Sequence, residues 1–157
     1  MNYLSKLFFS FCFVAGLGMA TVSSAQIPSD LTIQANIPYT FVVGDKQLPP
    51  GKYMIKVAGF NDLKLMLIRS EESHTAVFFY TENAEANDTP SRSELVFDKI
   101  GDTYFLSQIW LQGYRSGNHI MESKMQQELE SRGMTPEKRS VAGEVGRATK
   151  TVGKRIG

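Results

Sequence analysis

The side chains that could bind a metal ion are few in this chain. It has two histidines, and His74 closely follows Glu71 and Glu72, a combination of imidazole and carboxylates that could ligate a metal. Neither histidine has a second histidine at ligand spacing. The simpler interpretation of His74 is a solvated turn between two strands, and His119 lies in a polar segment expected to join a sheet to a helix. We therefore predict no metal site and no cofactor.

Three carboxylates between residues 94 and 102 are the best candidates for acid–base chemistry. Glu94, Asp98 and Asp102 fall on one expected hairpin, and a glycosidase needs two carboxylates at a set separation. The simpler interpretation is a water-facing sheet surface whose acids discourage aggregation. No Gly-x-Ser-x-Gly motif occurs. We predict that the protein is not an enzyme and has no catalytic residue, with a hydrolase that uses these acids as an alternative.

Aromatic side chains are frequent and could form a platform for sugars or single-stranded nucleic acid. On alternating strands such rings more often form the core. The chain has 17 Lys and Arg against 16 Asp and Glu, so no dense basic face favours nucleic acid as a partner. The aromatic residues singled out on the expected strands are Tyr39, Phe41, Tyr53, Phe78, Phe79, Tyr80, Phe97, Tyr104, Phe105 and Trp110.

Residues 1–25 have the pattern of a secretory signal peptide. Lys6 supplies the positive start, an apolar run follows, and small residues end at Ala25. The run is too short to cross a hydrocarbon core of about 30 Å. We expect cleavage near Ala25 and a periplasmic or extracellular protein. Cys12, the one cysteine, would leave with the signal, so the mature chain would have no disulfide to stabilise it.

Apolar and polar residues alternate from Leu31 to Leu111, with β-branched and aromatic residues between turn residues. This pattern predicts an antiparallel β domain over 26–117. We expect a mainly β fold, either a compact antiparallel β-sandwich or a small β-barrel, with a C-terminal α-helix.

One hairpin is expected over residues 93–111, with Gly101-Asp102 as its two-residue loop because glycine suits the first position of a type II′ turn. Tyr104 and Trp110 would share the inner face of this hairpin at the centre of the core. Its expected register pairs Phe97 with Leu106 and Leu95 with Gln108.

The period changes after Gly117, which predicts an amphipathic helix over 118–133 that ends at Gly133. Its apolar stripe would consist of Met121, Met125 and Leu129. Residues 134–157 form a basic segment in which Thr135-Pro136-Glu137 could start a helix, but three glycines would weaken it. We expect a weakly helical or disordered tail there, with possible weak contact to an anionic surface.

Two blocks resemble a known family. Residues 37–53, IPYTFVVGDKQLPPGKY, resemble the "IPFxFxVGxxxLPAGxY" block of an uncharacterised family of small exported bacterial β-proteins, and residues 101–110, GDTYFLSQIW, resemble its later "GDxYFLSQIW"-like block. Tyr39 and Pro50 depart mildly from the first block. The resemblance covers about residues 31–132 and implies an exported β-domain, with no active site or ligand attached to it.

The sequence thus favours an exported, non-enzymatic binding or scaffold module of the cell envelope. Its partner would be an envelope protein or polymer, and the mature chain is expected to have no transmembrane helix. A small-ligand carrier with an apolar β-barrel cavity is a second alternative, beside the hydrolase based on residues 94–102.

Overall fold

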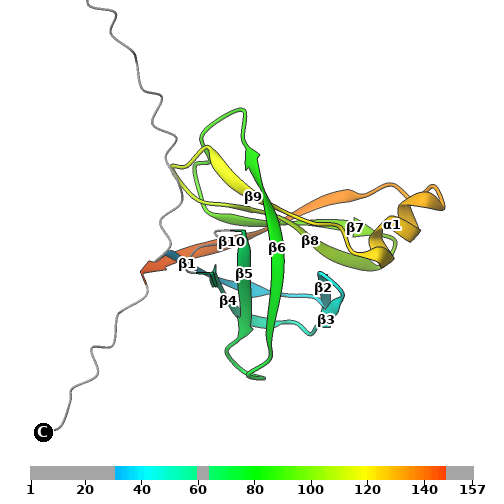
Figure 1. Ribbon diagram of the computed structural model, residues 1–157, viewed down its shortest axis with the longest axis horizontal. Coiled ribbons are helices and arrows are strands. Elements are labelled where there is room, and N and C mark those ends of the chain that lie inside the picture. The colour runs from blue at the N-terminus through cyan, green and yellow to red at the C-terminus, as the bar shows by residue number, and fades with distance from the viewer. Residues whose placement is uncertain (1–30, 60–63, 148–157) are drawn as a thin grey trace, which may run out of the picture.

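The computed structural model describes residues 31–59 and 64–147, so the predicted signal peptide lies outside the described residues. These residues form ten strands and one helix (Figure 1). None of their helices is both long enough and apolar enough to pass through a membrane. The helix is α1 (Lys124–Ser131), and the strands are β1 (Leu31–Ile37), β2 (Phe41–Val43), β3 (Lys46–Leu48), β4 (Gly51–Val57), β5 (Leu65–Ser70), β6 (Ala76–Glu85), β7 (Glu94–Ile100), β8 (Thr103–Trp110), β9 (Ser116–Ile120) and β10 (Glu137–Arg147).

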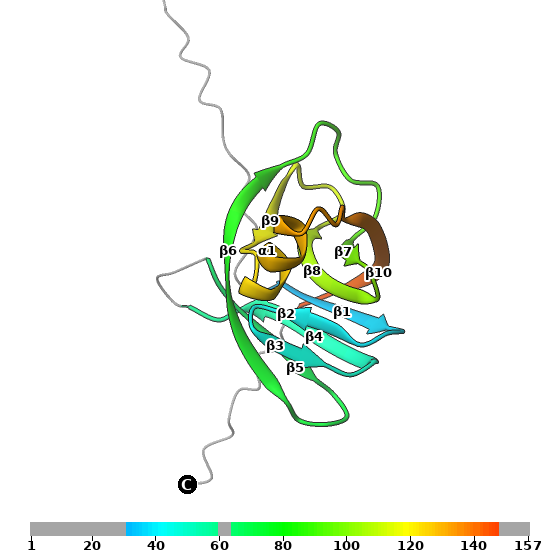
Figure 2. The ribbon, with the colours of Figure 1, turned by 90° about the vertical axis from the view of Figure 1, so that its right-hand side faces the viewer.

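The strands form two packed layers that share two long strands (Figure 2). They are hydrogen-bonded in the order β3-β2-β8-β7-β10-β1-β4-β5-β6-β9, and β9 also pairs with β8. β6 pairs first with β5 and then, from Thr81 onward, with β9. β10 pairs first with β7 and then, from Gly143 onward, with β1. Strands that pass from one layer to the other in this way form the corners of a sandwich.

Aromatic rings fill the space between the layers. Phe41 lies edge-on to Tyr53, with ring centroids 5.1 Å apart, and edge-on to Phe97 at 5.6 Å. All three rings are fully buried. Edge-to-face packing of this kind stabilises the core beyond the burial of apolar surface.

The prediction of a mainly β fold with one helix is confirmed, and of the two expected architectures the structure matches the sandwich.

One pairing differs from the expected all-antiparallel arrangement. β2 runs parallel to β8, with Phe41 opposite Tyr104 and Val42 opposite Phe105. β2 also forms a short antiparallel hairpin with β3, which is the outer strand of the sheet. The predicted two-residue hairpin loop is confirmed, since Ile100 pairs with Thr103 and Gly101 has a φ of 59°.

The helix is shorter than predicted and buries a different face. Residues 116–120 extend as β9, and α1 begins only after Ser123, whose Oγ accepts a hydrogen bond from the Gln126 amide at 3.1 Å. Leu129 packs on a small second core of Val42, Ile100 and Phe105. Met121 and Met125 are exposed, so the predicted methionine stripe is wrong. The predicted stop is correct, because Gly133 follows the helix with a φ of 84°.

The expected tail at 134–157 is wrong over most of its described part. Residues 137–147 form β10, which lies between β7 and β1. Gly143 and Gly146 weaken a helix, but in β10 they allow close approach, since a Cβ at Gly143 would lie 2.7 Å from Ile33 Cγ2. Pairing on both sides of the strand outweighs the local pattern. Residues 148–157 lie outside the described residues.

Candidate binding recess

A β-bulge turns Trp110 away from the core. The register of β7 and β8 shifts between Val96 and Phe97, so that Ser107 is the extra residue on β8. The Ser107 hydroxyl donates a hydrogen bond to the Val96 carbonyl at 3.2 Å. Because side chains alternate along a strand, one extra residue exchanges the two faces beyond it.

This exchange corrects two predictions about the hairpin. Phe97 pairs with Leu106 as expected, but Leu95 pairs with Ile109 rather than Gln108. Consequently Ile109 and Leu111 are buried in the core, whereas Trp110 is only half-buried and lies on the other face. The expectation that Trp110 lies at the centre of the core is therefore wrong.

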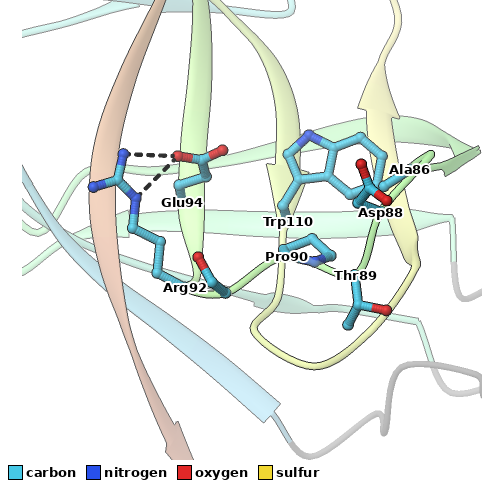
Figure 3. Close-up of a pocket in the computed structure, with 8 residues that line it drawn as sticks. Ala86, Asp88, Thr89, Pro90, Arg92, Glu94 and Trp110 are labelled. Atoms are coloured by element: carbon cyan, nitrogen blue, oxygen red, sulfur yellow. Dashed lines mark hydrogen bonds and ion pairs between the residues drawn. The ribbon is translucent and has the colours of Figure 1, made fainter.

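Trp110 lines a surface recess of about 440 Å³ (Figure 3). In Figure 3 the indole lies between Glu94 on β7 and the loop that carries Asp88, Thr89 and Pro90. Its Nε1 donates a hydrogen bond to Gln108 Oε1 at 3.1 Å, so the polar edge of the ring is satisfied within the protein. The remaining residues of the lining are Ala86, Ser91 and Arg92.

A glycine on β9 leaves room for the Trp110 indole. A Cβ at Gly117 would overlap Cε3 and Cζ3 of Trp110 and would lie 2.9 Å from the Ile109 carbonyl oxygen. Such distances are not tolerated without movement of the ring. The missing side chain at Gly117 therefore provides the space that the Trp110 ring occupies beside the recess.

The loop over the recess is held in place at three points. The Ala86 amide donates to the Arg115 carbonyl at 2.9 Å, and the Arg115 guanidinium donates back to the Ala86 carbonyl. The Gly113 amide donates to the Pro90 carbonyl at 3.0 Å. The Gln112 amide donates to Ser93 Oγ at 2.9 Å. These bonds pre-form the recess, which reduces the entropy that binding would cost.

Charged groups of both signs line the recess. Nε and Nη2 of Arg92 each donate to one Glu94 oxygen at 3.3 Å. The Glu94 side chain is 25% exposed and that of Arg92 is 66% exposed. Glu94 is also the direct cross-strand neighbour of Trp110. The recess thus combines an aromatic face with donors and acceptors whose remaining positions are open to a ligand.

The structure keeps the two histidines apart. His74 is exposed in the turn between β5 and β6, with a φ of 57°, and the neighbouring Glu71 and Glu72 are exposed as well. His119 is on β9, opposite Glu82 of β6 and Gln108 of β8. Within residues 31–59 and 64–147, no three His, Cys, Asp or Glu side chains are grouped so that they could hold a metal ion.

The three carboxylates of the hairpin lie in different surroundings. Glu94 is in the recess, and Asp102 is exposed in the two-residue loop. Asp98 is 5% exposed. Its Oδ1 has no hydrogen bond of good geometry, and its partner is the ammonium of Lys138 on β10 at 2.5 Å. The water-facing sheet surface expected for all three residues is thus wrong for Asp98.

A second recess, of about 530 Å³, lies where β10 passes from its pairing with β7 to its pairing with β1. Its lining combines apolar and charged side chains from three strands and the turn after β5. The lining residues are Gln34, Ala35, Asn36, Lys52, Tyr53, Glu71, Val141, Ala142 and Glu144.

Comparison with known proteins gave no match: none was found among protein-family models, curated proteins or solved structures.

Proposed function

We propose that this chain is an exported, non-enzymatic binding module of the cell envelope, and that the Trp110 recess binds a saccharide segment of an envelope polymer. The observation that carries the proposal is the position of Trp110. A large ring that the hairpin pattern would place in the core is turned outward by the Ser107 bulge, and the absence of a side chain at Gly117 leaves room for it.

The chemistry of the recess suits a sugar. The electron-rich face of an indole attracts the polarised C–H groups on one side of a pyranose ring. The Glu94 carboxylate and the Arg92 guanidinium accept and donate hydrogen bonds in pairs, which matches neighbouring hydroxyl groups. The volume of about 440 Å³ is within the usual range for ligand sites.

The arrangement of the other candidate groups supports binding rather than catalysis. Glu94 is paired with Arg92, while Asp98 is buried under Lys138 at the other end of β7. Acid–base hydrolysis needs two carboxylates facing one bond. Fully buried rings between the layers likewise support a surface binder over a carrier that needs an apolar interior cavity.

The single tryptophan of the chain makes the proposal directly measurable. We expect a soluble N-acetylated amino-sugar tetramer to shift the fluorescence of Trp110, and the protein to sediment with insoluble cell-wall glycan. Trp110→Ala should weaken binding to the glycan about 5- to 150-fold in this assay, because loss of a stacking ring costs about 1–3 kcal/mol. Met125→Ala removes an exposed apolar side chain on α1, away from the recess, and serves as the control.

Equal sedimentation of the Trp110→Ala protein and the unchanged protein would contradict the proposed site. Export is tested separately by cell fractionation and intact mass. We expect the protein in the envelope or outside the cell with residues 1–25 removed. A cytoplasmic protein that retains these residues would contradict that part of the proposal.

A further inference from the structure

One edge of β6 carries none of the usual protection against pairing. Over residues 76–80 β6 pairs with β5 on one side, and no strand among the described residues pairs with its other side. On this other side, pairing with β9 begins only at Thr81. Next to it, the Met121 amide donates a hydrogen bond to the Tyr80 carbonyl. The Thr75 carbonyl and the Thr81 amide form hydrogen bonds on the side of β5. Because the backbone groups of successive residues in a strand point to opposite sides, the N–H and C=O groups of Ala76 and Phe78 point toward the open side.

Other open edges of the same sheet are protected. The side of β10 opposite β7 is unpaired over 137–142 within the described residues, and this stretch begins with the charged residues Glu137, Lys138 and Arg139. The outer edge strand β3 has three residues, of which Lys46 is charged and exposed. Charges and short length are the means by which proteins prevent strand addition. The open β6 segment, AVFFY, contains no charge and no proline.

The outer face beside this edge is apolar. Phe78 is 63% exposed and Tyr80 is 55% exposed. Their direct cross-strand neighbours on β5 are Leu67 and Leu65, which are half-buried. An apolar face next to an unprotected edge is typical of an interaction surface.

We propose that this β6 edge joins a second copy of the chain, with the two β6 strands antiparallel about a two-fold axis at Phe78. In this register the two Phe78 residues face each other and exchange two N–H···O bonds, while Ala76 faces Tyr80 of the second copy. The same surface then serves both copies, as a two-fold dimer requires. One row across the joined sheet becomes Leu67, Phe78, Phe78 of the second copy and Leu67 of the second copy.

The electrostatic complementarity of a cation and an aromatic ring favours a second copy over an unrelated strand. Arg69 on β5 is exposed and lies opposite Ala76 of β6, and its side chain has no ion pair or hydrogen bond with any described residue. Across the small Ala76 side chain, Tyr80 of the second copy lies two strand spacings away, about 10 Å between backbones. A guanidinium can extend over alanine to the face of that ring and form a cation–π contact. The two-fold axis repeats this contact.

This inference does not depend on the Trp110 recess, and the oligomeric state tests it. We expect the protein to sediment as a dimer that dissociates on dilution, because a short strand pairing lies at the small end of stable interfaces. Phe78→Lys should give a monomer by placing like charges at the axis. Met125→Lys makes the same kind of change at an exposed residue of α1 and should leave the dimer intact.

A milder variant keeps the test decisive if Phe78→Lys does not fold. Arg69→Ala should raise the dimer dissociation constant about five- to thirtyfold, because the dimer loses two cation–π contacts, one per copy. A protein that remains monomeric at about 0.1 mM overturns the proposal and leaves this edge for a strand of another protein. A dimer that persists in folded Phe78→Lys also overturns it.

Discussion

Gly117 and Trp110 act as a pair at the scale of single residues. A side chain at position 117 would overlap the Trp110 indole, so only glycine leaves that space to the ring. Nothing in the local sequence marks this glycine, since its partner is on another strand.

Gly117→Ala should therefore destabilise the protein by about 1–3 kcal/mol, the usual cost of overpacking. Denaturant unfolding measures the change, and the emission of Trp110 should shift as the ring moves. Gly146→Ala is the matched control, because a Cβ there would meet Thr32 Oγ1 at 3.2 Å, a milder contact. A larger loss for Gly146→Ala than for Gly117→Ala would contradict the supporting role of Gly117.

Tyr39 contributes a pH dependence. Its hydroxyl is buried with no hydrogen-bond partner among the described residues, and its ring stacks on Tyr104 with centroids 3.8 Å apart. The pKa of Tyr39 is raised from 10.0 to about 12, chiefly by burial and also by charge on Tyr104, while the positive charge of Arg139 acts to lower it. Between these values the unfolded chain loses a proton that the folded chain retains.

The stabilisation linked to Tyr39 is thus fully present below pH 10 and is lost as the pH rises toward about 12. In Tyr39→Phe the free energy of unfolding should fall less steeply over this window, and at pH 7 it should change by no more than about 1 kcal/mol. Unfolding in urea at a series of pH values measures both. Identical slopes above pH 10 for the two proteins would show that the group does not titrate as described.

β10 shows, at the scale of elements, how the environment outweighs local preference. Thr135-Pro136-Glu137 resembles a helix start, and the glycines that follow weaken a helix. β7 and β1 each have an edge whose backbone groups need partners. As a strand, β10 forms hydrogen bonds with both edges. Beside the backbone ladder, the ion pair of Lys138 with Asp98 joins β10 to β7.

Lys138→Ala should destabilise the protein by about 1–3 kcal/mol, because it leaves the Asp98 carboxylate buried without its counter-charge. The value lies below that of a fully buried pair since the Lys138 side chain is 55% exposed. Arg139→Ala breaks an exposed pair with Glu137 and should cost less than about 1 kcal/mol. Thermal or urea unfolding compares them, and equal losses would argue against a special role for the Asp98 contact.

The two long strands hold the layers together at the scale of the whole molecule. β6 and β10 each pair within one layer and then within the other, so each belongs to both halves of the sandwich. Removing one of them opens a corner and exposes the ring-filled interior to water.

A chain that ends at Pro136 should consequently lose cooperative unfolding, because β1 and β7 each lose a partner strand. Circular dichroism during heating measures this, with Lys138→Ala as a control that keeps the strand. A sharp transition in the shortened chain would show that β10 is dispensable and that 134–157 acts as the tail expected from its sequence.

The sequence by itself determined the parts of this protein that depend on local chemistry. Alternation of apolar and polar residues over 31–111 predicts strands, Gly101 predicts the tight hairpin loop, and Gly133 ends the helix, since each of these rests on neighbours along the chain. The resemblance to an exported family and the signal peptide stay predictions.

Only the tertiary structure decided which residues form the candidate site. One extra residue at Ser107 exchanges the faces of β8, and the pattern of the sequence does not mark where the register shifts. The same holds for Gly143 and Asp98, whose surroundings come from distant strands. Hydrogen bonds and packing between segments far apart in the chain set these positions, and no local propensity encodes them.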